Sequence, residues 1–272
     1  MPIAPTQDSS RDARAFREEI RAGRHDGTTA GHARGNVQAN LVIVPHDAAF
    51  DFLLFCQRNP KPCPLLEVTD PGSPEPRMLA PGADLSRDLP RYRVFRDGEM
   101  VEERTDVSDL WRDDFVGFLL GCSFTFDWRL IGAGLEVRNF VQGTNVSMYR
   151  TNIPCRPAGV FEGPLVVSMR PFLPQDAIRA ALISAELPQV HGAPIHLGDP
   201  AAIGIEDLSA PDYGDPTPIH EGEQPVFWAC GVTPQEALLR AKLPIAITHA
   251  PGHMFVTDLR EDELPAFTER IT

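Results

Sequence analysis

Apolar residues recur along the chain at two spacings, which divide it into predicted helices and strands. Ala13, Phe16 and Ile20 lie three and four residues apart and Gly23 follows them, so an amphipathic helix is expected to end there. Short apolar runs bounded by Gly, Pro or polar residues predict buried strands. On this basis we expect strands at 41–45, 65–68, 145–151, 164–170, 225–231 and within 244–259, and helices at 47–59, 125–133, 174–185 and 233–242.

Local signals mark where some of these elements begin and turn. Asp47 is placed to cap the helix after the strand at 41–45, and the sequence TPQE at 233–236 has the form of a capping box. Asp97-Gly98, between RYRVF and EMVEE, is the dipeptide preferred in two-residue hairpin turns. An antiparallel pair is therefore predicted at 92–103.

The stretch that begins at Ser108 is predicted as a further helix, ended by Gly121. Its apolar stripe consists of Trp111, Phe115, Phe118 and Leu119. A helix at this place, followed by a second one at 125–133, would put Cys122 and Ser123 beside unpaired backbone N–H groups, where a thiol can be activated.

Length and composition bound the fold class. The chain has 272 residues, of which 42% are hydrophobic, enough to bury a large core in one α/β domain or, as we favour, in two. Its 27 prolines are about twice the usual share of ~5%. The Pro-rich linker that ends near residue 90 is therefore expected to be stiff and ordered.

The charge of the chain argues against two classes of binding partner. The net charge of -13 and the pI near 5.0 argue against nucleic acid and an anionic membrane surface, because both bind clustered Lys and Arg. The first residues hold no apolar signal segment, and no apolar run reaches the ~20 residues of a membrane span. Five cysteines without CxxC spacing fit reduced thiols. We expect a cytoplasmic protein, and leave open whether it forms a homo-oligomer.

Polar and reactive side chains concentrate between Gly121 and Pro157. Within 121–170, five arginines face three carboxylates although the whole chain is acidic. Because a guanidinium group matches a carboxylate with two parallel hydrogen bonds, this local excess predicts a small carboxylate-bearing ligand. Arg150 and Arg156 are the expected clamp, with internal pairing of each arginine as the alternative.

A second polar stretch follows the helix at 174–185. His191 and His196 stand in a loop bounded by Gly and Pro, and Asp199 follows. The spacing matches no zinc signature, so no metal or cofactor is assigned and a metal cluster is kept as the alternative. Imidazole titrates near pH ~6.5, so either histidine is a candidate general acid or base. His249, at the end of a predicted strand, is a secondary candidate.

Long segments of the chain resemble the hydro-lyase family that includes D-glutamate cyclase. The resemblance runs almost end to end, through TAGHARGNVQANLVIVP, GCSFTFD, NVSMYRTNIPC, HGAPIHLGDP, PVFWACGVTPQ and ITHAPGHMFVTD. It implies a lyase that eliminates water, and a mixed α/β fold made of a three-layer unit and a smaller two-layer α+β unit. We assign residues 1–90 and 171–272 to the larger unit and 91–170 to the smaller one.

For D-glutamate cyclase the implied product is 5-oxo-D-proline, formed when the amine attacks the side-chain carboxyl and water leaves. This reaction needs a carboxylate clamp, a general base, a general acid and donors to the oxyanion. The catalytic candidates are Cys122, Ser123, Asp127, His191 and His196, and the substrate-binding candidates are Asn145, Tyr149, Arg150, Arg156 and Asp199. Cys122 could donate a proton or form an acyl intermediate.

Two other functions stay open. A dehydratase of another hydroxy or amino acid would use the same parts, with Asp199 and the histidines as metal ligands. A non-catalytic small-molecule-binding or regulatory protein of amino-acid metabolism would keep the arginines but not need Cys122 or His191.

Asp127 departs from the family pattern, where many members have Glu, and the shorter carboxylate leaves its role open.

Overall fold

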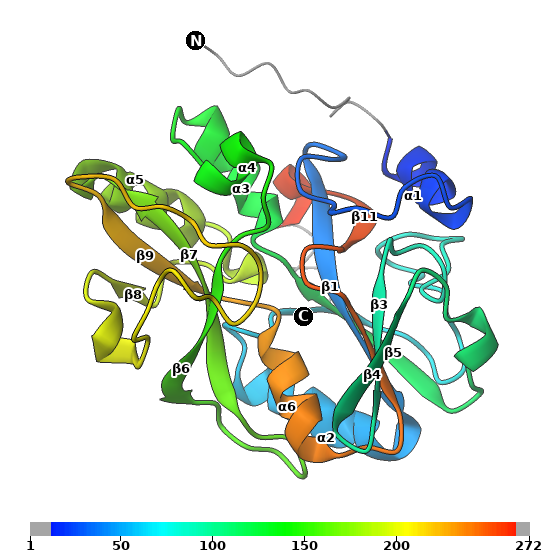
Figure 1. Cartoon of the computed structure of the whole chain (residues 1–272). Helices are drawn as coiled ribbons and strands as arrows, with labels where there is room; N and C mark the ends of the chain where they lie inside the picture. Colours follow the sequence, from blue (N-terminus) through cyan, green and yellow to red (C-terminus); the bar gives the residue numbers. More distant parts are fainter. Residues whose placement is uncertain (1–11, 265–272) are drawn as a thin grey trace.

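The computed structural model describes residues 12–264, which form two antiparallel β-sheets with helices packed on them (Figure 1). The helices are α1 (Ala13–Arg21), α2 (His46–Arg58), α3 (Phe124–Gly132), α4 (Arg138–Gln142), α5 (Pro174–Ala185) and α6 (Thr233–Ala241), and short 3₁₀ helices η1 to η4 lie at Ser108–Leu110, Pro188–Val190, Pro200–Ile203 and Glu261–Glu263. The mixed α/β class is confirmed. Among the described helices none is long and apolar enough to cross a membrane.

Seven strands form the larger sheet: β1 (Asn36–Pro45), β2 (Leu65–Val68), β3 (Tyr92–Arg96), β4 (Glu99–Arg104), β5 (Phe115–Gly121), β10 (Ala246–His249) and β11 (Phe255–Arg260). Their order is β2-β5-β1-β10-β3-β4, and β11 also pairs with β1. The long central strand β1 pairs with β5 from Ala39↔Gly121 to Pro45↔Phe115. At the predicted hairpin, Asp97 and Gly98 have φ of 50° and 85° between β3 and β4, which confirms it.

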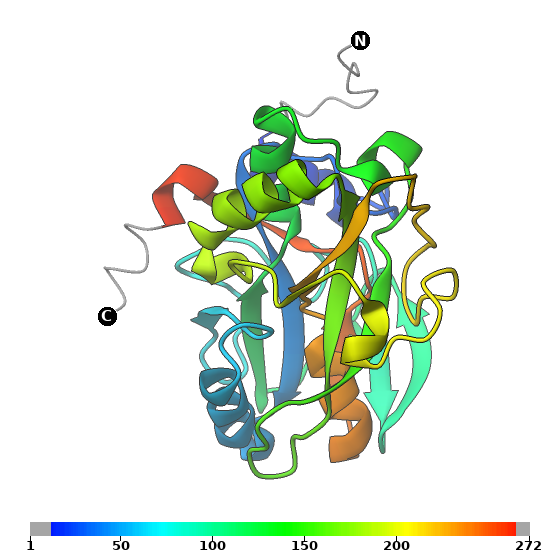
Figure 2. The same ribbon diagram turned by 90° about the vertical axis from the view of Figure 1, so that its left-hand side faces the viewer.

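Four strands form the smaller sheet: β6 (Met148–Pro154), β7 (Pro164–Phe172), β8 (His196–Leu197) and β9 (Gln224–Ala229), in the order β6-β7-β9-β8. α2 and α6 share one apolar core with both sheets, in which Phe52 and Leu238 lie with Val42 of β1 and Met169 of β7. Both views show α3 and α5 at one end of β1 and α2 and α6 at the other (Figures 1 and 2).

The helix predicted from Ser108 to Gly121 is wrong. Only η1 is helical there, and Phe115–Gly121 is strand β5. Every residue of β5 is buried because the strand lies between β1 and β2 and is covered on both faces. Its apolar run therefore has no alternation that would distinguish it from a helix. Two predicted caps are also absent, because the N-caps of α2 and α6 are Pro45 and Val232, without side-chain hydrogen bonds.

The two sheets divide the chain differently from the predicted domains. β3, β4 and β5 come from 91–170 but belong to the larger sheet, while β8 and β9 come from 171–272 but belong to the smaller one. The chain passes from the larger sheet to the smaller after β5, and returns after β9. The division into domains stays a prediction, while these two crossings are features of the fold.

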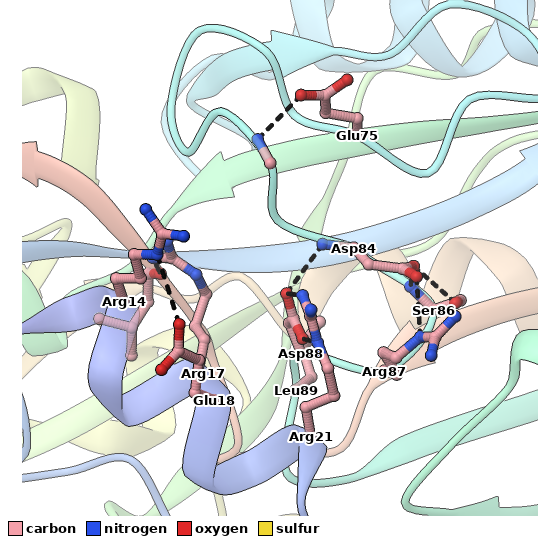
Figure 3. A network of polar contacts seen from close by, with 12 residues as sticks. Arg14, Arg17, Glu18, Arg21, Glu75, Asp84, Ser86, Arg87, Asp88 and Leu89 are labelled. Atoms are coloured by element: carbon pink, nitrogen blue, oxygen red, sulfur yellow. Dashed lines mark hydrogen bonds and ion pairs between the residues drawn. The ribbon is translucent and has the colours of Figure 1, made fainter.

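The Pro-rich segment between β2 and β3 is held by carboxylate side chains (Figure 3). The buried carboxylate of Asp88 accepts two hydrogen bonds from Arg21 of α1, at 2.7 and 2.6 Å, and a third from the Asp84 N–H at 2.8 Å. Asp84 in turn accepts hydrogen bonds from Ser86 and Arg87. These contacts join parts of the segment to one another and to α1, while the stiffness expected from its prolines stays a prediction.

Candidate active site

Two strand-to-helix turns meet between the sheets. β5 ends at Gly121 and α3 begins at Phe124, while β9 ends at Ala229 and α6 begins at Thr233. In each turn a cysteine directly follows the strand, Cys122 in one and Cys230 in the other. Both pack in a single cluster that we call the junction site: Cys122, Phe124, Val146, Met148, Val166, Cys230, Val232 and Met254, with Ala30 and Tyr213 packed against it.

Both thiols of the junction site are almost withdrawn from water. Cys122 is 6% exposed and Cys230 8%. Burial raises the pKa of Cys122 to about 12 against a hydrogen bond from the Phe124 N–H, and that of Cys230 to about 11 against one from the Val232 N–H. At neutral pH both are therefore protonated thiols, which hold a proton that can be transferred, and not the thiolates that attack a carbonyl carbon.

Two amide side chains on one face of β1 line the same region. Gln38 donates through Nε2 to the carbonyl oxygens of Thr29 at 3.0 Å and His32 at 3.3 Å, and Asn40 donates to the Gly121 carbonyl at 2.8 Å. The Gln38 Oε1 atom is buried and has no hydrogen-bond partner within residues 12–264. Sequence reasoning missed both, although amides with a period of two on a strand that is buried along nearly all its length are a signal for a site.

Two glycines allow the backbone to approach this closely. A Cβ atom at Gly231 would overlap the Asn40 amide group, and one at Gly121 would overlap the backbone carbonyl of Gln189. The second contact is with backbone, which cannot turn aside. Glycine is therefore required at residue 121, and a larger residue at 231 would displace the Asn40 amide.

Asn145, a predicted substrate-binding residue, lies at the edge of the junction site. Its Nδ2 donates to the Pro251 carbonyl at 3.2 Å, and its Oδ1 is buried without a partner in the described chain. Gly252, packed against the Asn145 side chain, accepts hydrogen bonds from the Thr29 N–H at 2.9 Å and the Thr28 hydroxyl at 2.8 Å. Loops 28–32 and 250–254 are thus joined over the amide groups.

Asp127 and Ser123 are held by a buried arginine. Arg170 of β7 contacts the two carboxylate oxygens of Asp127 at 2.8 and 2.9 Å and donates to the Ser123 hydroxyl at 3.1 Å. Its guanidinium group lies over the rings of Phe126 and Trp228. Burial raises the pKa of Asp127 against the lowering effect of Arg170. The carboxylate fastens α3 to the smaller sheet, and its catalytic role stays a prediction.

His191 is buried near the same arginine. Its Nδ1 lies 2.8 Å from the carbonyl oxygen of Lys61, and its backbone φ is 81°. Burial lowers the pKa of His191 to about 4, and the charge of Arg170 acts in the same direction. The ring is therefore neutral at physiological pH, and whether it exchanges a proton with a substrate stays a prediction.

Arg150, predicted as a clamp, is engaged by carboxylates of the protein. It donates to Glu236 at 2.8 Å and to Asp212 at 2.6 Å, and its guanidinium group lies 5.1 Å from the centre of the Tyr213 ring. The Tyr213 hydroxyl donates to the same Glu236 oxygen. Arg150 thereby fixes Tyr213 against the junction site, and a substrate carboxylate would have to displace one of these partners.

The other predicted binding residues lie elsewhere. Arg156 has an exposed side chain and bonds through its backbone N–H to Asn59 at 2.8 Å. Tyr149 is buried in the core beside α2 and donates to the Leu208 carbonyl at 2.7 Å. The structure therefore does not bring Arg150 and Arg156 together as one clamp.

His196 begins strand β8 of the smaller sheet, and Asp199 lies in the turn between β8 and η3. The His196 Nε2 lies 2.7 Å from the Asp199 carbonyl oxygen, while the Asp199 carboxylate caps η3. Within residues 12–264, no three side chains of His, Cys, Asp or Glu are grouped so as to hold a metal ion. Two open surface hollows lie away from the junction site, one beside Arg91 and Glu103 and one along 151–157.

Comparisons with known proteins place the chain in a family. The family model for D-glutamate cyclase matches residues 116–258, which include both turns of the junction site. A protein named putative hydro-lyase from Geobacillus kaustophilus is 60% identical over 94% of this chain and 96% of its own length. The putative hydro-lyase of Rubrobacter xylanophilus is 62% identical over 91% and 95%, and putative hydro-lyase YcsI of Bacillus subtilis is 56% identical over 93% and 98%.

Among solved structures, a nitrogen repressor-like protein from Methanococcus jannaschii aligns with 86% of this chain and 91% of its own, at 11% identity and a TM-score of 0.35. That similarity is too low to support a conclusion about fold or function. The family match and the near full-length relatives carry the assignment instead. The chain belongs to the D-glutamate cyclase family.

Proposed function

We propose that this protein is a hydro-lyase that closes D-glutamate into 5-oxo-D-proline at the junction site. Family membership supports the reaction class. The site is supported by one observation above all: two helix N-termini and two thiols meet beside buried amides that have oxygens without a hydrogen-bond partner among residues 12–264. A dry, mostly apolar site with a few directed polar groups suits a small substrate.

Ring closure forms one C–N bond and breaks one C–O bond. The substrate's ammonium nitrogen loses one proton and attacks the side-chain carboxyl carbon as an amine, and it loses a second proton from the tetrahedral adduct. The departing oxygen leaves as water with two protons, so the reaction balances without an external proton donor. The protein has to neutralise the substrate's carboxylates, stabilise the tetrahedral oxyanion and move protons over a short distance.

Groups for these tasks lie in the two turns. The N–H groups of Ser123 and Gly231 form no hydrogen bond within residues 12–264. Both residues lie just before a helix, α3 or α6, and the N-terminal end of a helix attracts negative charge. We assign these two N–H groups to binding the carboxylates of the substrate and the oxyanion of the tetrahedral adduct. The side-chain oxygens of Gln38 and Asn145, which have no partner in the described part of the chain, would orient the ammonium group. Cys122, with its pKa raised to about 12, would donate a proton.

A proton NMR time course with D-glutamate, L-glutamate and a set of hydroxy acids tests the proposal. We expect 5-oxoproline from D-glutamate, and a loss of about 10²–10⁴-fold in kcat for Cys122→Ala. Cys56→Ala removes an equally buried thiol from another core cluster and should keep the rate. Binding without turnover would identify a binding protein instead, and turnover of a hydroxy acid alone would identify a different dehydratase.

A further inference from the structure

We propose that Cys122 and Cys230 act as a pair, each carrying one of the two protons that pass from the substrate's nitrogen to its departing oxygen. Cys230 is then a catalytic residue alongside Cys122. The inference rests on the proposed function, because it assigns the proton path of that reaction.

The two cysteines occupy equivalent turns. Each is the first residue after a strand of one of the two sheets, and each carbonyl oxygen accepts the N–H of the residue three positions on: Thr125 at 3.1 Å from Cys122, and Thr233 at 3.0 Å from Cys230. Each sulfur accepts the N–H of the residue two positions on. The turns come from different sheets yet present their sulfur atoms in the same way.

Both sulfurs also share one environment. They belong to the same apolar cluster, and the charge of ionised Cys230 raises the pKa of Cys122. The buried Arg170 acts on both thiols and lowers the pKa of each. The other three cysteines lie in the core beside α2. Cys122 and Cys230 are therefore set apart as a pair by position and by mutual influence.

The number of protons in the reaction explains the need for two thiols. The first proton leaves the nitrogen before the amine attacks, and the second leaves it in the tetrahedral adduct. In both states the nitrogen and the departing oxygen lie at the same carbon, so a sulfur that faces this carbon reaches both. A thiol gives its proton to the oxygen, and the resulting thiolate takes one from the nitrogen, which restores it. One such cycle moves one proton, and loss of water requires two.

The surroundings of the two cysteines keep both of them protonated between turnovers. Desolvation is the largest cause of the raised pKa of each thiol. Asp127, paired with Arg170, raises the pKa of Cys122 further. A thiolate formed during turnover is consequently a strong base and recovers its proton from the ammonium group at once.

The test compares Cys122→Ser, Cys230→Ser and the double variant, with Cys56→Ser as a control that puts the same hydroxyl at an equally buried site. Each single variant is expected to lose about 10²–10⁴-fold in kcat with little change in KM. The double variant should be no slower than the slower single one, since groups that act as a unit are not additive. Thermal melting followed by circular dichroism checks that each variant folds.

A second measurement separates proton transfer from packing. In mixtures of light and heavy water, a plot of the wild-type rate against the deuterium fraction should be curved, because two protons move. The same plot for the residual rate of Cys230→Ser should be a straight line. A folded Cys230→Ser variant with the full wild-type rate would refute the role of the cysteine pair but would leave the proposed function standing. If the wild-type protein forms no 5-oxoproline, the proposed function falls, and the pair with it.

Discussion

At the scale of single residues, burial changes the chemistry expected from sequence. A cysteine just before a helix was expected to be activated, because helix N-termini favour a thiolate. In the fold, withdrawal from water outweighs the Phe124 N–H, and the pKa of Cys122 rises instead. The proton-donor role is favoured over the acyl intermediate for this reason. The burial of a side chain cannot be predicted from its position in sequence beside a helix.

His191 should make the fold sensitive to acid. Its pKa in the folded protein is lowered to about 4, mainly by desolvation, while in the unfolded chain it stays near 6.5. As the pH falls through this window the unfolded chain binds a proton that the folded protein does not, so stability is full above about pH 6.5 and is lost below it. The loss at the acid end amounts to roughly 3 kcal/mol.

Urea unfolding between about pH 7 and about pH 4.5 measures this effect. His191→Asn should make the dependence shallower, because asparagine tolerates the positive φ but carries no titrating group. The dependence should not vanish, because burial also lowers the pKa of His249 to about 4. The exposed His220 offers a control, as His220→Asn should leave the wild-type profile unchanged. A wild-type stability that is flat over this range would contradict a buried neutral imidazole at residue 191.

At the scale of elements, local signals predicted most of the strands and helices. The hairpin at Asp97-Gly98 and the helix at 174–185 depend on neighbours in sequence, and both were predicted. Strand β5 was not, because a strand covered on both faces loses the alternation that identifies it. The role of Arg150 was also out of reach, since its partners Asp212 and Glu236 lie 62 and 86 residues away.

The turn after β5 should not accept a larger residue. Gly121→Ala places a methyl group against the backbone carbonyl of Gln189, so either β5 or η2 has to move, at a cost of about 1–3 kcal/mol. Gly132→Ala, at the end of α3, meets no atom within 4 Å and should be neutral or stabilising by about 0.4–1 kcal/mol. Urea unfolding of both variants compares them, and equal stabilities would refute the close contact.

At the scale of the whole molecule, a surface loop closes the junction site. Tyr213 packs against the thiol cluster, and its hydroxyl is held by Glu236 of α6. We expect Tyr213→Phe to keep the ring and the backbone bridge to Met148 but to loosen the loop, so that amides at 211–215 exchange hydrogen faster. Tyr92→Phe removes a buried hydroxyl from another core cluster and should leave those amides unaffected. Unchanged exchange in Tyr213→Phe would show that other contacts hold the loop.

The two passages of the chain between the sheets have a mechanical consequence. Between β5 and β10 the backbone leaves the larger sheet once and returns once, and the cysteines stand at the start of these passages. The core that both sheets share with α2 and α6 keeps these two turns in place. If the loop that carries Tyr213 moves aside to admit a substrate, the two sulfur atoms therefore keep their spacing.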